Sequence, residues 1–281
     1  SHHRTTSVRC CHRSVSSPGV RRRPAVGMPV TMPAFESTLP AGAPELMRAS
    51  AFRAYLDQES THAGAASTRL STLQPSVLQD LLRFERGGRA TALLEVVAAG
   101  LRHGHALLVH VEHGQHVLPL TLFPRDRLLH APMPLPALLA MRLDAFEVLQ
   151  VEPAVLRPPR PGGRGPQADH ARCAPLDPFV WELALRGRIG ELLPELAGGA
   201  AYRVAPAADL RALALEGTLG AAVERLRRGT TNLREIAAWP GFDRSRAMRL
   251  LNALYLLSAL IVSRTHPAAT QDVWRAGLGR A

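Results

Sequence analysis

The sequence NLREIAAWPGFDRSRAMRLLNALYLLSALIVSR, at residues 232–264, decides the fold of the C-terminal part of the chain. It predicts a short helix, a Pro-Gly turn, a longer helix and an apolar strand. Asn232 stands three residues before Glu235, as in a capping box, and Asp243 is a suitable N-cap for the longer helix. Together with a helix predicted over residues 217–229, this order is typical of a winged-helix domain with a helix-turn-helix core.

The longer helix has two faces of different composition. At 100° per residue, an apolar stripe for the core is formed by Ala247, Leu250, Leu251, Leu254 and Leu257. The opposite face mixes polar residues with the apolar Met248 and Leu256, which suits a contact with another protein. The candidate protein-interaction residues are therefore Met248, Arg249, Asn252 and Leu256.

An alternative is that the same helix reads DNA. In that hypothesis Arg249 binds guanine and Asn252 binds adenine in the major groove, while Arg244 and Arg246 contact phosphates. Ser245 lies on the same face of the predicted helix. The apolar residues on this face favour the protein contact over the DNA contact.

The composition excludes several kinds of enzyme. The chain has 281 residues, 46% of them hydrophobic, and a net charge of +11, and all 34 of its basic residues are arginine. Without lysine there is no phosphate-loop lysine, no Schiff base and no kinase-type lysine. Three cysteines give no paired disulfide framework. The positive charge is concentrated outside residues 66–157, which have nine arginines against eight acidic residues.

The N-terminal sequence contains no recognisable targeting segment. It has no apolar core like that of a signal peptide, and the longest apolar run, residues 253–262, is shorter than the ~20 residues of a membrane span. We therefore expect a cytoplasmic protein without a membrane partner. Residues 1–31 are expected to be an upstream extension, because Met32 opens a more natural start; a disordered basic tail fits the same composition.

Changes in composition predict five segments. They are a basic N-terminal extension with one short helix (1–65), an α+β domain (66–157), a Pro/Gly/Arg linker (158–175), a mainly helical winged-helix-like domain (176–266) and a tail (267–281). Limited proteolysis is expected to cut first in the linker.

The predicted fold class is α+β, with a small antiparallel sheet and flanking helices followed by the helical domain. The α+β domain is predicted to contain helices over residues 73–88, 90–104 and 135–141, a β-hairpin over 105–124 and strands over 127–132 and 145–153. The helical domain is predicted to contain further helices over residues 177–187 and 189–199 and a strand over 201–206.

A cluster of histidines could form a metal site. His110, His113 and His116 recur at intervals of three, which would bring them together on a helix. The segment reads as a hairpin, however, and strand alternation places His110 and His113 on opposite faces. We expect no bound metal and no cofactor, and a metal-dependent enzyme using these histidines is the least favoured alternative.

Residues 233–264 resemble the winged-helix segment that follows PATAN-type domains in bacterial signalling proteins. The matching positions are Leu233, Ile236, Ala237, Leu250, Leu254, Tyr255 and Leu257, whereas the usual glycine before the last strand is replaced by Ser258 or Ala259. The stretch from Leu118 to Pro153 is similar to the family's middle pattern at Leu129, His130, Ala131 and Phe146. The resemblance implies a non-catalytic module coupled to two-component or motility signalling.

The sequence therefore favours a non-catalytic regulatory protein that acts by binding another protein of a bacterial signalling pathway. A winged-helix transcriptional regulator is the first alternative.

Overall fold

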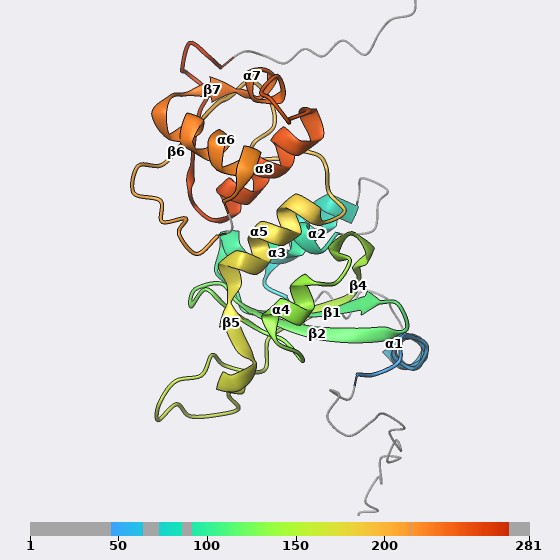
Figure 1. The fold of residues 1–281 in the computed structure, drawn as a ribbon. Coiled ribbons are helices and arrows are strands. Elements are labelled where there is room, and N and C mark those ends of the chain that lie inside the picture. The colour runs from blue at the N-terminus through green and yellow to red at the C-terminus, as the bar shows by residue number, and fades with distance from the viewer. Residues whose placement is uncertain (1–45, 64–72, 86–91, 214, 270–281) are drawn as a thin grey trace, which may run out of the picture. The chain divides into compact units, whose positions relative to one another are not determined.

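The computed structural model describes residues 46–63, 73–85, 92–213 and 215–269. These residues all belong to one unit of the chain that begins at Ala41. The predicted upstream extension, residues 1–31, lies outside the described residues, as does the tail beyond residue 269. The described chain has the predicted α+β class, with an antiparallel sheet, flanking helices and a mainly helical C-terminal region (Figure 1).

The larger sheet has five antiparallel strands in the order β4-β1-β2-β3-β5. They are β1 (Leu107–His113), β2 (His116–Phe123), β3 (Leu128–His130), β4 (Glu147–Pro153) and β5 (Cys173–Pro175). The predicted hairpin is confirmed: His113 pairs with His116 around Gly114, whose positive φ of 63° suits glycine. Alternate residues such as Val109 and Leu120 pair directly and are fully buried, so they form the core face of the sheet.

Helices α2 (Pro75–Glu85), α3 (Leu93–His103), α4 (Leu135–Leu139) and α5 (Leu176–Arg186) pack against this buried core. Helix α3 begins where the Glu95 side chain accepts the Ala92 backbone N–H (3.0 Å), and it ends at Gly104 in the left-handed region. The residues of α3 from Leu93 to Gly100, apart from Glu95, are buried, so this helix forms the centre of the core.

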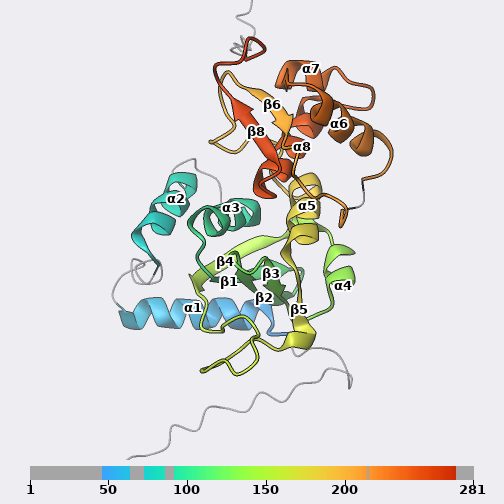
Figure 2. The same ribbon diagram turned by 90° about the vertical axis from the view of Figure 1, so that its left-hand side faces the viewer.

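Helix α1 (Ala49–Ala63) lies on the opposite side of the sheet from α3 (Figure 2). Its buried residues Ala49, Phe52 and Leu56 form a small second cluster with Val117 of β2. Arg53 adds an ion pair with Glu112 of β1 at 2.7 Å. Helices thus cover both faces of the hairpin, in agreement with the predicted antiparallel sheet with flanking helices.

The C-terminal region contains the predicted helix-turn-helix core. Its elements are β6 (Ala201–Val204), α6 (Gly217–Arg228), β7 (Thr231–Asn232), α7 (Leu233–Ala237), α8 (Arg244–Leu256) and β8 (Leu260–Ser263). Strand β6 is the middle strand of a three-stranded antiparallel sheet in the order β7-β6-β8. Because β6 precedes α6 in the chain, no hairpin loop joins it to β8.

Two expectations about local structure differ from the observed elements. The helix expected over residues 189–199 is absent: this described segment consists of turns and bends, and Pro194 stands in its middle. The expected linker, residues 158–175, ends in a short 3-10 helix, η2 (His170–Arg172), and in β5, which completes the larger sheet beside β3. A second 3-10 helix, η1 (Leu143–Ala145), precedes β4.

Helix α5 connects the two predicted domains through packing. It contacts α3 and β3 on one side and α8 on the other, and its Phe179, Val180 and Trp181 are buried in a single core cluster. That cluster includes residues of the larger sheet and residues of α8. The separation of residues 66–157 from residues 176–266 by proteolysis stays a prediction.

Candidate functional site at helix α8

The turn between α7 and α8 is built by two side-chain caps. The Asn232 side chain accepts the Glu235 backbone N–H (2.9 Å), and the Asp243 side chain accepts the Arg246 backbone N–H (2.7 Å). Gly241 lies between the helices with a φ of 75°, which a residue with a side chain rarely adopts. Both caps are those that the sequence predicted, and they fix where α8 begins.

Arg249 of α8 binds the end of α5. One of its guanidinium nitrogens donates to the carbonyl of Leu185 (3.0 Å) and to that of Gly187 (2.6 Å). These carbonyls belong to the last turn and cap of α5, where a helix has unsatisfied acceptors and a partial negative charge. Arg249 therefore serves as a C-terminal cap for a neighbouring helix.

Asn252 of α8 binds the segment that follows α5. Its Oδ1 accepts the Leu193 backbone N–H (2.9 Å), and its Nδ2 donates to the Glu191 carbonyl (2.7 Å). The side chain is fully buried, with none of its surface exposed. One amide thus satisfies one donor and one acceptor of a segment that has no secondary structure of its own.

The expectation that Met248, Arg249, Asn252 and Leu256 form an exposed interaction face is wrong. Asn252 is fully buried, Leu256 is 5% exposed, and Met248 and Arg249 are half-buried. Within α8 only Arg244 is exposed. The reason is tertiary: α5 and residues 188–196 cover the face that helical periodicity left open.

Two further residues of the DNA hypothesis, Arg246 and Ser245, also contact groups of their own chain. Arg246 donates to the Gly241 carbonyl (2.7 Å) and to Thr218 Oγ1 (2.8 Å), and it stacks over the Phe242 ring. Ser245 is so close to Gly190 that a Cβ on this glycine would lie 3.0 Å from the serine Oγ. The polar side chains expected to read bases are therefore directed at groups of their own chain.

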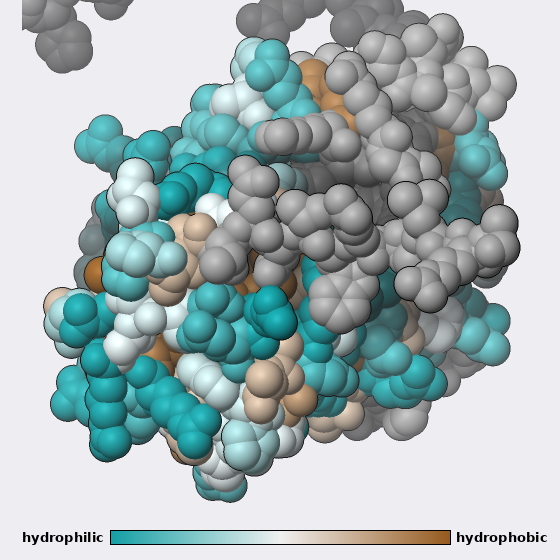
Figure 3. Space-filling model, turned by 90° about the horizontal axis from the view of Figure 1, so that it is seen from above, coloured by the Kyte–Doolittle hydropathy of each residue, from teal (hydrophilic) through white to brown (hydrophobic). Residues whose placement is uncertain are grey.

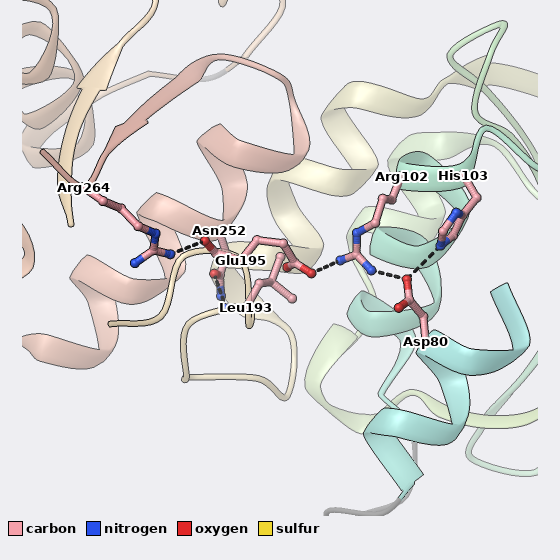
Figure 4. A network of polar contacts seen from close by, with 7 residues as sticks. All are labelled: Asp80, Arg102, His103, Leu193, Glu195, Asn252 and Arg264. Atoms are coloured by element: carbon pink, nitrogen blue, oxygen red, sulfur yellow. Dashed lines mark hydrogen bonds and ion pairs between the residues drawn. The ribbon is translucent and has the colours of Figure 1, made fainter. Parts of the chain in front are cut away.

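A polar network continues from this segment to the helices of the larger sheet (Figure 4). Arg102 of α3 forms ion pairs with both Asp80 of α2 and Glu195. Arg264, just after β8, donates to the Glu195 carbonyl (2.9 Å). Residues 191–196 are thus held by α3 on one side and by α8 and the end of β8 on the other.

Asp80 is the carboxylate at the centre of the α2–α3 contact. Its Oδ2 lies 2.9 Å from His103 Nε2 and also pairs with Arg102. Burial alone would raise the pKa of Asp80, but the His103 hydrogen bond and the Arg102 charge outweigh burial and lower that pKa below its ordinary value. The ionised form of Asp80 is therefore stabilised by folding.

His110 and His113 of the hairpin are placed on opposite faces, as strand alternation predicted. The His110 ring lies 4.7 Å from Phe52 of α1, whereas His113 contacts Phe146 edge-on at 5.3 Å on the core side. Burial lowers the pKa of His110, so its neutral form is favoured. No group of three or more potential ligands is positioned to hold a metal ion within the part of the chain that the structure describes.

Sequence reasoning missed the residues that connect the two parts of the core. Arg102, Glu195 and Arg264 belong to no motif, and they are far apart in the chain. The only local signal was the polar Asn252 within an apolar helix, which indicates either a surface site or a buried hydrogen bond.

Comparisons with protein-family models, with curated proteins and with solved structures found no match. Among the residues that the structure describes, no helix is long and apolar enough to cross a membrane.

Proposed function

We propose that this chain is a non-catalytic regulatory protein that binds an extended segment of another protein along the outer edge of β8. The observation that supports the proposal is the composition of this edge. Among the described residues β8 is the last strand of its sheet, and its sequence LIVS has no charge. An uncharged, mainly apolar edge strand is a template for pairing with another chain.

The outer strands of the larger sheet differ from β8. Strand β4 has charged residues at Glu147 and Glu152, ends in Pro153, and has a register irregularity beside His110 of β1. Strand β5 is only three residues long and ends in Pro175. Charges, proline, bulges and short length are the features that protect sheet edges from added strands. Strand β8 has the short length but lacks the other three.

The register of β8 defines which backbone groups point outward. The Ala205 N–H donates to the Ala259 carbonyl opposite it (2.8 Å), so alternate residues of β8 bond to β6. The backbone groups of Leu260 and Val262 therefore point away from β6. Ile261 adds an apolar side chain that is 46% exposed on the solvent face of the sheet.

The chain after β8 turns toward the other side of β6. The Ala268 carbonyl accepts a hydrogen bond from Asn232 Nδ2 of β7 (3.2 Å). Strand β7 is at the opposite edge of the three-stranded sheet from β8. On the coloured part of the face in Figure 3, hydrophobic residues lie as separate spots among hydrophilic ones. An edge contact through backbone groups fits this surface better than a broad apolar interface.

The resemblance to PATAN-type signalling proteins supports a partner from a bacterial signalling pathway. A cytoplasmic location remains part of the proposal. The DNA-binding alternative loses its main argument, because Arg249 and Asn252 bind backbone groups of their own chain.

The test uses Val262→Pro in the full chain. Proline removes the outward N–H while the bonds of the alternate residues to β6 remain, so it blocks strand addition with little effect on the fold. A partner is isolated by pull-down with the wild-type chain, and its affinity for each variant is measured by calorimetry. We expect at least tenfold weaker binding by Val262→Pro and by Ile261→Lys, which adds an edge charge.

The matched control is Val155→Lys, which introduces the same charge at an apolar residue that is 73% exposed outside β8. It should bind the partner as the wild type does. Unchanged affinity of Val262→Pro and Ile261→Lys would show that the partner contacts another surface. If sedimentation shows that the wild-type chain is a dimer and that Val262→Pro is a monomer, the segment bound at β8 belongs to a second copy of this chain.

A further inference from the structure

The loop from Arg157 to Gln167 is closed by its own hydrogen bonds. The Arg157 N–H donates to the Pro166 carbonyl (3.0 Å), and the Ala168 N–H donates to the Arg157 carbonyl (2.8 Å). Inside the loop the Arg160 N–H donates to Gln167 Oε1 (2.9 Å). Such a loop, with its ends fixed together and a side chain packed within, has the features of an Ω-loop, a type that is frequently functional.

Glycines give this loop its tight course. Gly162 and Gly165 have positive φ values of 71° and 91°, which place them in the left-handed region. The side-chain amide of Gln167 packs directly on Gly163, where any Cβ would collide with it. The backbone of the loop is therefore set by its own residues.

Three arginines of the loop surround one hollow. Arg157, Arg160 and Arg164 line a space of about 380 Å³ together with Asp126, Pro158, Gly163 and Gln167. Its volume is within the range of roughly 300–1,000 Å³ of small-molecule sites, at the small end. Four charged side chains therefore face a single space, three of them cationic.

The charges of the hollow are not balanced. Arg160 donates to Asp126 at 2.7 Å, which accounts for the one carboxylate. In the described ranges no carboxylate pairs with Arg157 or Arg164, and the hydrogen bond from the Arg157 guanidinium to the Arg164 carbonyl is long, at 3.5 Å. Two like charges that share a hollow repel each other, and an anion between them would remove this repulsion.

We propose that this hollow binds the phosphate group of a small phosphorylated molecule, with Arg157 and Arg164 as the main ligands. Guanidinium groups bind phosphate through paired, charge-assisted hydrogen bonds, and a phosphate monoester offers three acceptor oxygens and nearly two negative charges. Asp126 is a competitor within the site, because it occupies Arg160 and repels the anion.

The lining of the hollow also limits the rest of the ligand. No aromatic ring is among the lining residues, so the site lacks a surface on which a nucleobase would stack. We therefore assign a compact phosphomonoester, for which glycerol 3-phosphate is a suitable probe. Inorganic phosphate and a phosphoserine peptide are the comparison ligands.

Calorimetric titration of the full chain at low salt tests the proposal. Arg157→Gln and Arg164→Gln should each bind glycerol 3-phosphate about tenfold more weakly, the size expected for the loss of a charge-assisted hydrogen bond. Asp126→Asn should bind several-fold more tightly, because it releases Arg160 and removes a negative charge. The control Arg228→Gln removes the same charge from an exposed residue at the end of α6 and should bind as the wild type does.

Each contrary result is decisive. Failure of the wild type to bind glycerol 3-phosphate saturably would overturn the proposal. Equal weakening by Arg228→Gln and Arg164→Gln would show attraction by net charge without a site. Much tighter binding of the phosphoserine peptide than of glycerol 3-phosphate would replace the small molecule by a phosphorylated protein. Unchanged or weaker binding by Asp126→Asn would remove the assigned role of that carboxylate.

Discussion

Helix α8 and the loop of residues 157–167 use arginine in opposite ways. Arg249 directs its guanidinium at two carbonyls of α5, and Arg246 binds a carbonyl and a hydroxyl. Arg157 and Arg164 line an open hollow and pair with no carboxylate in the described chain. The residue type is the same, and the difference lies in whether a neighbouring element brings unsatisfied acceptors.

This difference separates structural arginines from candidate ligand-binding ones. An arginine that caps another helix stabilises the fold and is not free for a ligand. An arginine that a closed loop holds in the open contributes little to stability and remains available to an anion. Substitution of a capping arginine in α8 should therefore lower the stability of the fold. Substitution of Arg157 or Arg164 should change the stability little and weaken anion binding.

The largest effect is expected at Asn252. Asn252→Leu keeps the volume but leaves the Leu193 N–H and the Glu191 carbonyl without their partner. The free energy of unfolding should fall by about 2–4 kcal/mol, measured by urea denaturation. Arg244→Gln, at the exposed position of the same helix, should change it by less than about 0.5 kcal/mol.

Asn252→Leu also tests the DNA hypothesis. If Asn252 reads adenine, Asn252→Leu should leave the stability unchanged and abolish binding to a DNA duplex. That result would restore α8 as a recognition helix and would require the segment 188–196 to move away from it.

A smaller effect is expected at Arg249. Arg249→Met keeps the apolar stem and removes the donors to the Leu185 and Gly187 carbonyls, so the free energy of unfolding should fall by about 1–2 kcal/mol. Arg164→Met should change it by less than about 0.5 kcal/mol. Thermal and urea unfolding of both variants provide the comparison. Equal losses at the two positions would show that the loop arginine is structural as well.

Local sequence patterns predicted most of the fold. The hairpin around Gly114, the caps at Asn232 and Asp243, and the apolar stripe of α8 all depend on residues close together in the chain. Their physical causes are strand alternation, side-chain capping and helical periodicity, which a single sequence displays.

The candidate site could not be predicted in the same way. The second buried face of α8 depends on contacts with residues about 60 positions earlier in the chain, such as Leu193 and Glu191. A helix was predicted over residues 189–199, yet Leu193 and Leu196 of this segment are buried without a helix. Periodicity shows which face of a helix is apolar, but it does not show which elements cover the opposite face.

The smallest effect concerns Arg102, whose guanidinium binds carboxylates and so differs from both other kinds of arginine. It pairs with Asp80 and Glu195, and Asp80 also contacts His103. Because folding lowers the pKa of Asp80, its contribution to stability is present above about pH 4, near the ordinary value of 3.8. That contribution is lost as the pH falls through the folded-state pKa, since the unfolded chain binds the proton first. A double-mutant cycle of Asp80→Asn and Arg102→Met should therefore give a coupling of about 0.5–1 kcal/mol at pH 7 that decreases as the pH is lowered below 4. Glu195 is present in all four chains, so its own titration largely cancels. A coupling that stays constant over this pH range would mean that Asp80 and Arg102 do not interact as an ion pair, and that α2 is held to α3 by its apolar residues alone.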